Sequence, residues 1–122
     1  MIFGWFKRKP KQLWPEAKWI VQIEENCVRV TDDAGVTKSV RFDNLSGIAI
    51  ETNDSGPWGA DFWWLFFDQE DQLACAFPEG ATGQGETVDH LLKLPGFRHD
   101  EFTKAIRSTS NAVFAVWRKG EG

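Results

Sequence analysis

The segment from Gly80 to Thr87 comes closest to a motif with chemistry of its own. Its glycines and threonine have the spacing of a phosphate-binding loop, Gly-x4-Gly-Lys-Thr, between an expected strand and an expected helix. Glu86, however, stands where that loop has its lysine, and a carboxylate there repels the phosphates that the lysine would neutralise. We therefore predict no nucleotide site and no cofactor. We interpret the segment as a crossover in which Glu86 favours the start of a helix.

The other titratable residues do not form a catalytic or metal-binding set by their spacing. His90 and His99 are the only histidines, and two imidazoles fall short of the four ligands that zinc binds in a tetrahedron. Asp68, Glu70 and Asp71 alternate loosely like a calcium loop, which would also need a central glycine and a terminal glutamate. The sequence predicts no catalytic residue and no metal ligand.

The loop that begins at Thr52 is the candidate binding site. It combines carboxylates with a Gly-Pro turn and a tryptophan, and a tryptophan at a loop tip is a typical anchor of protein interfaces. In an equally weighted alternative, Trp58 folds back onto the sheet edge, because a tryptophan in such a Trp-rich chain is often buried. The candidate binding residues are Thr52, Asp54, Ser55, Gly56, Pro57, Trp58 and Asp61.

Period-two alternation of apolar residues predicts the strands that position this loop. They are expected over residues 18–24, 27–31, 36–42, 48–52, 62–67, 73–77 and 112–117. Asp32 to Gly35 predicts a tight hairpin, and Asn44 and Gly47 predict a second turn. The run from Phe62 to Phe67 is apolar on both faces and should form a central strand that is covered on both sides.

Helical spacing replaces this alternation from Val88 onward, and Pro95 should end the first helix. Asp100 is expected to cap a second helix, which should turn three residues inward: Phe102, Ala105 and Ile106. The predicted fold class is therefore α+β. We expect a curved antiparallel sheet or half-barrel of six to seven strands, with two C-terminal helices and a strand as the last element.

Length and composition indicate one globular domain. The chain has 122 residues, of which 42% are hydrophobic and 26% charged. Its net charge of −4 argues against a nucleic-acid binder, which normally carries a basic excess. Cys27 and Cys75 form no Cys-x-x-Cys pair, and the apolar start precedes the basic cluster, the reverse of a signal peptide. We therefore expect free thiols in the cytoplasm.

Residues 1–15 differ from the rest, so we divide the chain into an aromatic and basic tail, 1–15, and a single α+β domain, 16–122. The tail combines aromatic residues with four cations, Lys7, Arg8, Lys9 and Lys11. The simplest interpretation is a frayed terminus. The alternative is peripheral membrane contact through residues 1–11, with aromatics between the headgroups and cations facing anionic lipid.

Three segments resemble a family of small bacterial proteins of unknown function: residues 50–68, 77–97 and 112–117. In that family an acidic Thr-x-x-x-Gly-Pro loop precedes an aromatic strand, and a Pro-x-Gly-Ala-x-Gly segment leads into a helix that ends Leu-Pro-Gly-Phe. The resemblance covers about residues 19 to 118. It implies a bacterial origin and a shared design of these segments, and it transfers no activity.

The expected function rests on surface features, namely an acidic balance and aromatic residues in loops. We expect a non-enzymatic cytoplasmic module that binds another protein, and a homodimer stays open as well. The alternative is a small-ligand-binding protein or enzyme with a pocket near Asp54, Asp61 and a histidine.

Overall fold

Seven strands and two helices make up the part of the chain that the computed structural model describes, residues 19–53 and 62–120. The strands are β1 (Ile20–Glu24), β2 (Cys27–Thr31), β3 (Thr37–Arg41), β4 (Leu45–Thr52), β5 (Phe62–Asp68), β6 (Leu73–Pro78) and β7 (Ala112–Arg118). The helices are α2 (Gln84–Leu92) and α3 (His99–Arg107), with a short 3-10 helix, η2 (Phe42–Asn44), before β4. Within the described ranges no helix is long and apolar enough to cross a membrane.

The first three strands form a small antiparallel sheet in the order β1-β2-β3. Its buried face follows the predicted alternation, since Val28 on β2 pairs with Val40 on β3 and both are buried. The hairpin between β2 and β3 lies where it was predicted. There Gly35 has a φ of 87°, and Asp32 Oδ1 accepts hydrogen bonds from the Ala34 and Val36 amides at 2.9 Å.

The other four strands form a second antiparallel sheet in the order β6-β5-β4-β7. β5 is an inner strand, and Trp63 and Trp64 on its opposite faces are only 2% and 1% exposed. The prediction of a central strand covered on both sides is thus confirmed. Trp64 faces the same side as Phe77 of β6, with which it pairs, and its ring lies 5.6 Å from that of Phe102 on α3. That face of the sheet therefore packs on the helices.

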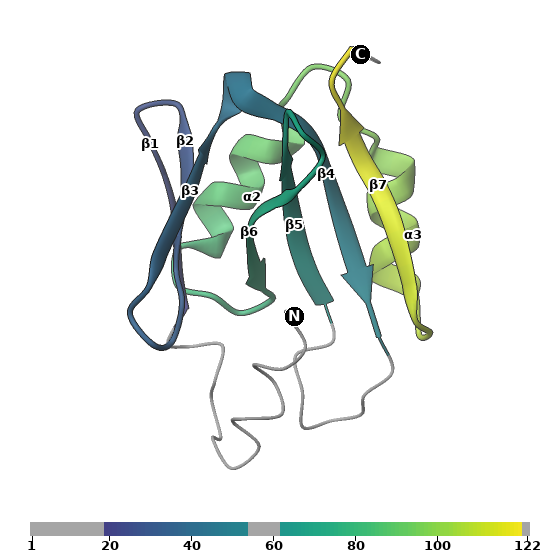
Figure 1. Cartoon of the computed structure of the whole chain (residues 1–122). Coiled ribbons are helices and arrows are strands. Elements are labelled where there is room, and N and C mark those ends of the chain that lie inside the picture. The colour runs from purple at the N-terminus through teal and green to yellow at the C-terminus, as the bar shows by residue number, and fades with distance from the viewer. Residues whose placement is uncertain (1–18, 54–61, 121–122) are drawn as a thin grey trace.

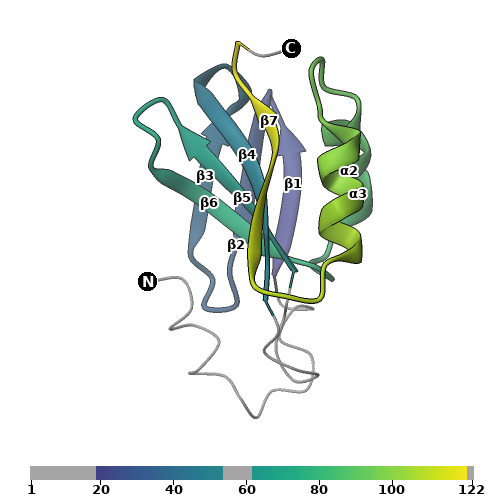
Figure 2. The same cartoon turned by 90° about the vertical axis from the view of Figure 1, so that its right-hand side faces the viewer.

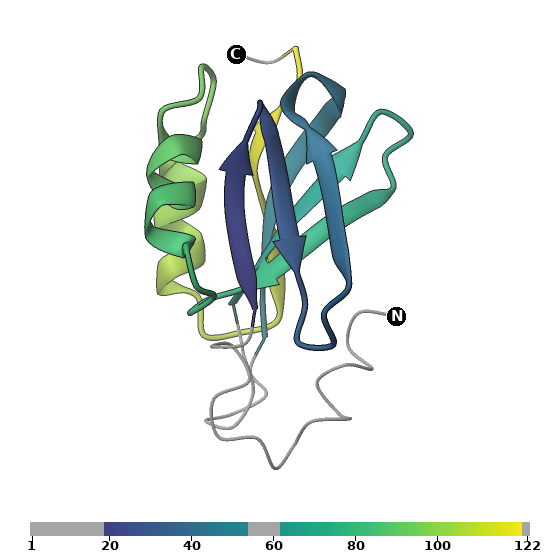
Figure 3. The same cartoon turned by 90° about the vertical axis from the view of Figure 1, so that its left-hand side faces the viewer.

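Both helices lie on the same side of the second sheet, as Figure 2 shows. α2 lies beside β1 and α3 lies behind β7, so the two helices are spread apart over the sheet (Figure 1). The first sheet stands at the β6 side, with β1 next to α2 and with β2 and β3 farther from that helix (Figure 3). The α+β prediction with antiparallel strands, two late helices and a final strand is confirmed, while the strands divide between two sheets that do not close into a barrel.

Two local expectations, one about a turn and one about a helix cap, were wrong. No turn separates Asn44 from Gly47, because β4 already begins at Leu45. Gly47 instead lies at a bulge, with the Trp117 carbonyl only 3.3 Å from where a Cβ would stand. Asp100 is not a cap: it lies in the first turn of α3, whose N-cap is Arg98. The Arg98 amide donates to the Val116 carbonyl at 2.7 Å, so β7 fixes the start of α3.

The first helix starts earlier than the apolar pattern predicted. α2 begins at Gln84, directly after Gly83, which has a φ of 88°. A Cβ on Gly83 would collide with the Val21 carbonyl oxygen, so the backbones of β1 and of this helix start are in close contact. Because the first turn of α2 is largely polar, the spacing of apolar residues could not reveal it.

Candidate functional site

Thr52 is the one predicted binding residue that the structure describes, and it is an internal anchor. Its side chain is 3% exposed, and its Oγ1 donates to the Ser110 carbonyl at 2.8 Å and lies 3.0 Å from the Ser108 hydroxyl. These contacts bind the end of β4 to the turn that precedes β7. The other predicted binding residues lie outside the described part of the chain: Asp54, Ser55, Gly56, Pro57, Trp58 and Asp61.

An apolar groove opens between α2 and α3 at the end of the molecule where β4 ends and β5 begins. Phe62 and Trp64 of β5 form part of its lining, and the groove has a volume of about 440 Å³. Each helix contributes two residues four positions apart, which lie on one face of a helix. These residues are Gln84 and Val88 of α2, and Phe102 and Ile106 of α3.

The floor of the groove is held in place by aromatic packing. The Trp64 ring is stacked with Phe77 at 6.2 Å between centroids and lies 6.4 Å from Phe62 in an edge-on arrangement. Trp64 is almost fully buried, while Ile106 at the rim is 59% exposed. The groove therefore combines a fixed aromatic floor with an aliphatic side chain that still faces water, which favours a large apolar group from a partner.

The polar groups of the groove are few. Among the described lining residues only Glu79 has an ionisable side chain, and it is exposed. Gln84 Oε1 accepts a hydrogen bond from the Gly80 amide at 2.6 Å, which leaves the side-chain NH₂ of Gln84 as a donor. The groove thus offers one negative charge and one amide beside an apolar floor, an arrangement suited to binding rather than to moving a proton.

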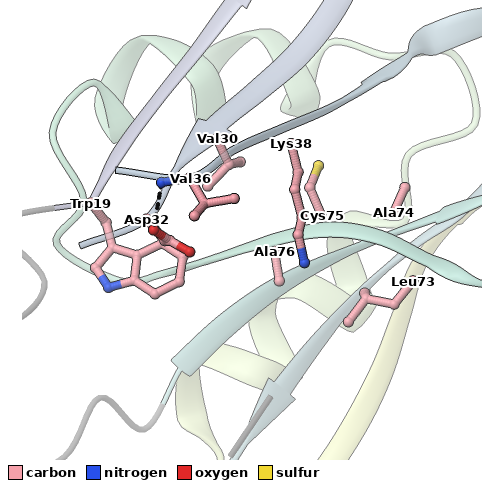
Figure 4. A pocket seen from close by; sticks show the side chains of 9 residues that line it. All are labelled: Trp19, Val30, Asp32, Val36, Lys38, Leu73, Ala74, Cys75 and Ala76. Carbon is pink, nitrogen blue, oxygen red and sulfur yellow. Dashed lines mark hydrogen bonds between the residues drawn. The ribbon is translucent and has the colours of Figure 1, made fainter. Parts of the chain in front are cut away.

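A second cleft lies between the β2–β3 hairpin and β6 (Figure 4). Trp19, Val30 and Ala76 line it, and the Lys38 side chain lies alongside Cys75. Its volume of about 40 Å³ is enough for water-sized molecules and far below that of a ligand site. Burial raises the pKa of the Cys75 thiol to about 12, against a smaller opposing effect of the Lys38 ammonium. The cleft is therefore a narrow gap between packed elements, and the thiol within it is unreactive.

The two histidines lie away from the described ends of the 54–61 segment. Thr52 pairs with both Phe62 and Ala112, whereas α3 starts beside Val116, four residues further along β7. His99 begins α3 there, and its Nε2 lies 2.9 Å from the Leu92 carbonyl oxygen. Neither this histidine nor the one on α2 stands at the loop end, and residues 19–53 and 62–120 contain no group of three metal-ligating side chains.

His90 lies in a polar depression of about 380 Å³ between β1 and α2, which Glu24 and Glu86 also line. Its ring is 5.2 Å from that of Phe42. Thr87 lines the same depression, and its buried hydroxyl has no hydrogen-bond partner in the described residues. Glu24 is already paired with Arg29 on β2. The depression is lined mainly by polar side chains, two of them carboxylates, and lacks the aromatic floor of the groove.

No protein-family model, no curated protein and no solved structure matches this chain. The resemblance described from the three sequence segments stays a prediction, and no residue role is transferred from it. The candidate site therefore rests on the geometry of the groove.

Sequence reasoning missed the groove because it assigned its residues to the core. Ile106 was expected to face inward, and this was wrong: Ala105 is 1% exposed while its neighbour Ile106 is 59% exposed. Ile106 lies at the edge of the apolar face of α3, where only Ala105 is fully buried, and its side chain stays largely in water. Because Phe102 and Ile106 share the helix face with Ala105, spacing alone could not separate the covered residue from the uncovered one.

Proposed function

We propose that this protein is an interaction module whose α2–α3 groove binds a segment of another protein through a large apolar side chain. The observation that carries the proposal is the exposure of Ile106 at 59% directly beside the aromatic floor formed by Phe62 and Trp64. Interface anchors are typically aromatic or large apolar groups seated in such preformed pockets.

The charge of the molecule supports a basic partner segment. The described residues contain fourteen Asp and Glu against nine Lys and Arg, a net charge of −5 with neutral histidine. Glu79 adds a carboxylate at the groove itself. Such a field speeds the approach of a cationic segment and disfavours an acidic one. A segment that combines an aromatic anchor with Lys or Arg fits the groove best.

We place this module in the cytoplasm, as the sequence predicted. The thiols of Cys27 and Cys75 are both free, which supports a reducing compartment.

The proposal is tested by affinity capture with three forms of the full chain, followed by identification of the captured proteins. The forms are the wild type, Ile106→Gln in the groove and Val113→Thr on β7, an exposed apolar residue outside the groove with 62% exposure. We expect a protein that the wild type and Val113→Thr retain and that Ile106→Gln loses. A synthetic segment of that protein should bind the wild type about tenfold more tightly than Ile106→Gln, since ~1–3 kcal/mol is typical for one apolar anchor.

Both substitutions replace exposed side chains, so each should change the free energy of unfolding by about 0.5 kcal/mol or less. A partner that binds all three forms equally would show that its site is elsewhere and would overturn the assignment to the groove. Amide chemical shifts recorded during the titration locate the contact: shifts at Val88, Phe102 and Ile106 support the proposal, and shifts confined to the β2–β3 hairpin contradict it.

A further inference from the structure

We infer that the groove is occupied within the same molecule by the N-terminal segment of the chain, residues 1–18, through its aromatic residues Phe3, Trp5 and Phe6. The inference rests on the proposed function, because it requires that the groove binds a basic, aromatic segment. It goes further by naming a segment of this chain as the resident ligand, with which an outside partner must compete.

The point at which this segment joins the described body lies beside the groove. The Trp19 carbonyl accepts a hydrogen bond from the Thr82 amide at 2.8 Å, and the Val21 amide donates to the Thr82 carbonyl at 2.8 Å. Gln84, which lines the groove, is only two residues beyond Thr82. The N-terminal segment is therefore tethered next to the α2 wall of the groove.

The length of the segment allows its aromatic residues to reach the groove. Phe6 lies thirteen residues before Trp19, and an extended chain of that length spans up to about 40 Å. A tether of this length keeps its end at an effective concentration on the order of millimolar. Even a weak contact between one aromatic ring and the floor is then occupied for much of the time.

The charges of the two parts are complementary. Residues 1–18 contain five Lys and Arg and a single acidic residue, Glu16, whereas the described body has a net charge of −5. Lys7, Arg8 and Lys9 follow the aromatic residues directly, so a ring in the groove brings cations close to its rim, where Glu79 lies. The segment thus has the chemistry that the groove selects, an apolar anchor followed by positive charge.

The inference is tested in the full chain by paramagnetic broadening. A nitroxide is attached at Gly4→Cys in a Cys27→Ser background, in which buried Cys75 stays unlabelled. We expect loss of the amide signals of Val88, Phe102 and Ile106 and retention of those in the Glu25-Asn26 turn. Adding Ile106→Gln should restore the groove signals, and adding Val113→Thr should leave them broadened.

Two further experiments test the alternatives, a second copy of the chain in the groove and a membrane contact of the N-terminal segment. In a mixture of isotope-labelled chain without nitroxide and unlabelled chain with nitroxide, broadening of the groove signals would assign the groove to a second copy and overturn the inference. In the second experiment, vesicles of phosphatidylcholine and phosphatidylserine are added at low salt. Tail signals that respond to these vesicles, together with groove signals that are never broadened, would make the segment a membrane contact and also overturn it.

The two proposals fail in different ways. Unbroadened groove signals combined with a partner that depends on Ile106 would overturn the intramolecular contact and leave the interaction module standing. Broadened groove signals that Ile106→Gln does not restore would also contradict the inference, because the contact would then lie outside the apolar groove. If no partner depends on Ile106 and the groove signals stay sharp, both proposals are wrong.

Discussion

At the scale of single residues, two side chains with the chemistry of site residues lie in the protein interior: the Thr52 hydroxyl and the Cys75 thiol. Thr52 was a predicted binding residue, yet its hydroxyl is committed to the Ser110 carbonyl and the Ser108 hydroxyl. Cys75 has the residue type of a nucleophile, yet burial holds it in the neutral form. Their partners, which the sequence does not reveal, decide what these groups do.

We predict that Thr52→Val lowers the free energy of unfolding by ~1–3 kcal/mol, because the substitution keeps the shape and removes the buried hydroxyl that donates to the Ser110 carbonyl and lies beside the Ser108 hydroxyl. Urea denaturation measures the change. Thr103→Val is the matched control, since the Thr103 hydroxyl also donates to a carbonyl, that of His99 at 3.0 Å, but is exposed to water. It should change stability by about 0.5 kcal/mol or less. Equal losses in both variants would contradict an anchoring role for Thr52.

A second prediction concerns the pH dependence that Cys75 confers. In the folded protein the pKa of the Cys75 thiol is about 12, whereas in the unfolded chain it is near the ordinary value of 9.0. The unfolded state therefore loses the proton first as pH rises above 9, and stability falls, by at most ~1.4 kcal/mol per pH unit. The measurement compares urea denaturation of the wild type and Cys75→Ala from pH 8 to pH 11. The stability advantage of the wild type should shrink as pH rises, and a constant difference would contradict the burial effect.

At the scale of elements, the junction between β1 and α2 depends on Gly83, a position that has no room for a side chain. Gly83 combines a positive φ with a close approach to Val21, whereas Gly85 in the first turn of α2 has no atom within 4 Å of where a Cβ would stand. The two glycines are two residues apart, and their surroundings have opposite consequences for substitution.

We predict that Gly83→Ala destabilises the protein by more than the ~1–3 kcal/mol that a positive φ alone costs, because β1 must also move away. Gly85→Ala should instead stabilise it by roughly 0.5–1 kcal/mol, since alanine is the better helix former and meets no neighbour. Thermal melts of both variants provide the measurement. A Gly83→Ala protein as stable as the wild type would show that the contact between β1 and the start of α2 is not needed.

The elements that sequence reasoning predicted are those with a strong local signal. The hairpin at Asp32–Gly35 follows from turn chemistry, and the inner position of β5 follows from its two apolar faces. What it could not predict depends on distant backbone. The bulge at Gly47 lies in the pairing of β4 with β5, and the Trp117 carbonyl of β7 also approaches this glycine. The start of α3 is set by the hydrogen bond from the Arg98 amide to the Val116 carbonyl.

The candidate site was the least predictable part for the same reason. Whether Ile106 is covered depends on how far α2 and α3 are spread over the second sheet. That spacing is a property of three elements together, while apolar periodicity reports one element at a time. The predicted loop residues from Asp54 to Trp58 and Asp61 lie outside the described residues, so Trp58 as an interface anchor stays a prediction.

At the scale of the whole molecule, the chain has an uneven charge distribution. Its net charge of −4 is the sum of a basic N-terminal segment and a more acidic body. The described strands and helices lie between Ile20 and Arg118. The division into a tail, 1–15, and one domain, 16–122, stays a prediction.

We predict that a chain starting at Glu16 unfolds in a single cooperative urea transition, because the described sheets and helices are retained in full. Fluorescence and far-UV circular dichroism should give coincident curves. The matched comparison removes residues 1–24 and with them β1, whose Val21 is only 1% exposed in the core. That chain should lose the transition. If the chain that starts at Glu16 already unfolds without a cooperative transition, the tail is part of the domain and the prediction is wrong.

The position of β7 has a consequence for how the protein is made. β7 is the last strand of the described part, and it pairs with β4, so that Val113 lies opposite Glu51, 62 positions earlier in the sequence. The β1–β3 sheet, in contrast, pairs neighbouring segments and can form as soon as residue 41 has left the ribosome. Until β7 is synthesised, the edge of β4 is an unpaired strand among buried apolar residues, a state that invites pairing with other nascent chains. We therefore expect the risk of such mispairing to be greatest while α2 and α3 are being translated.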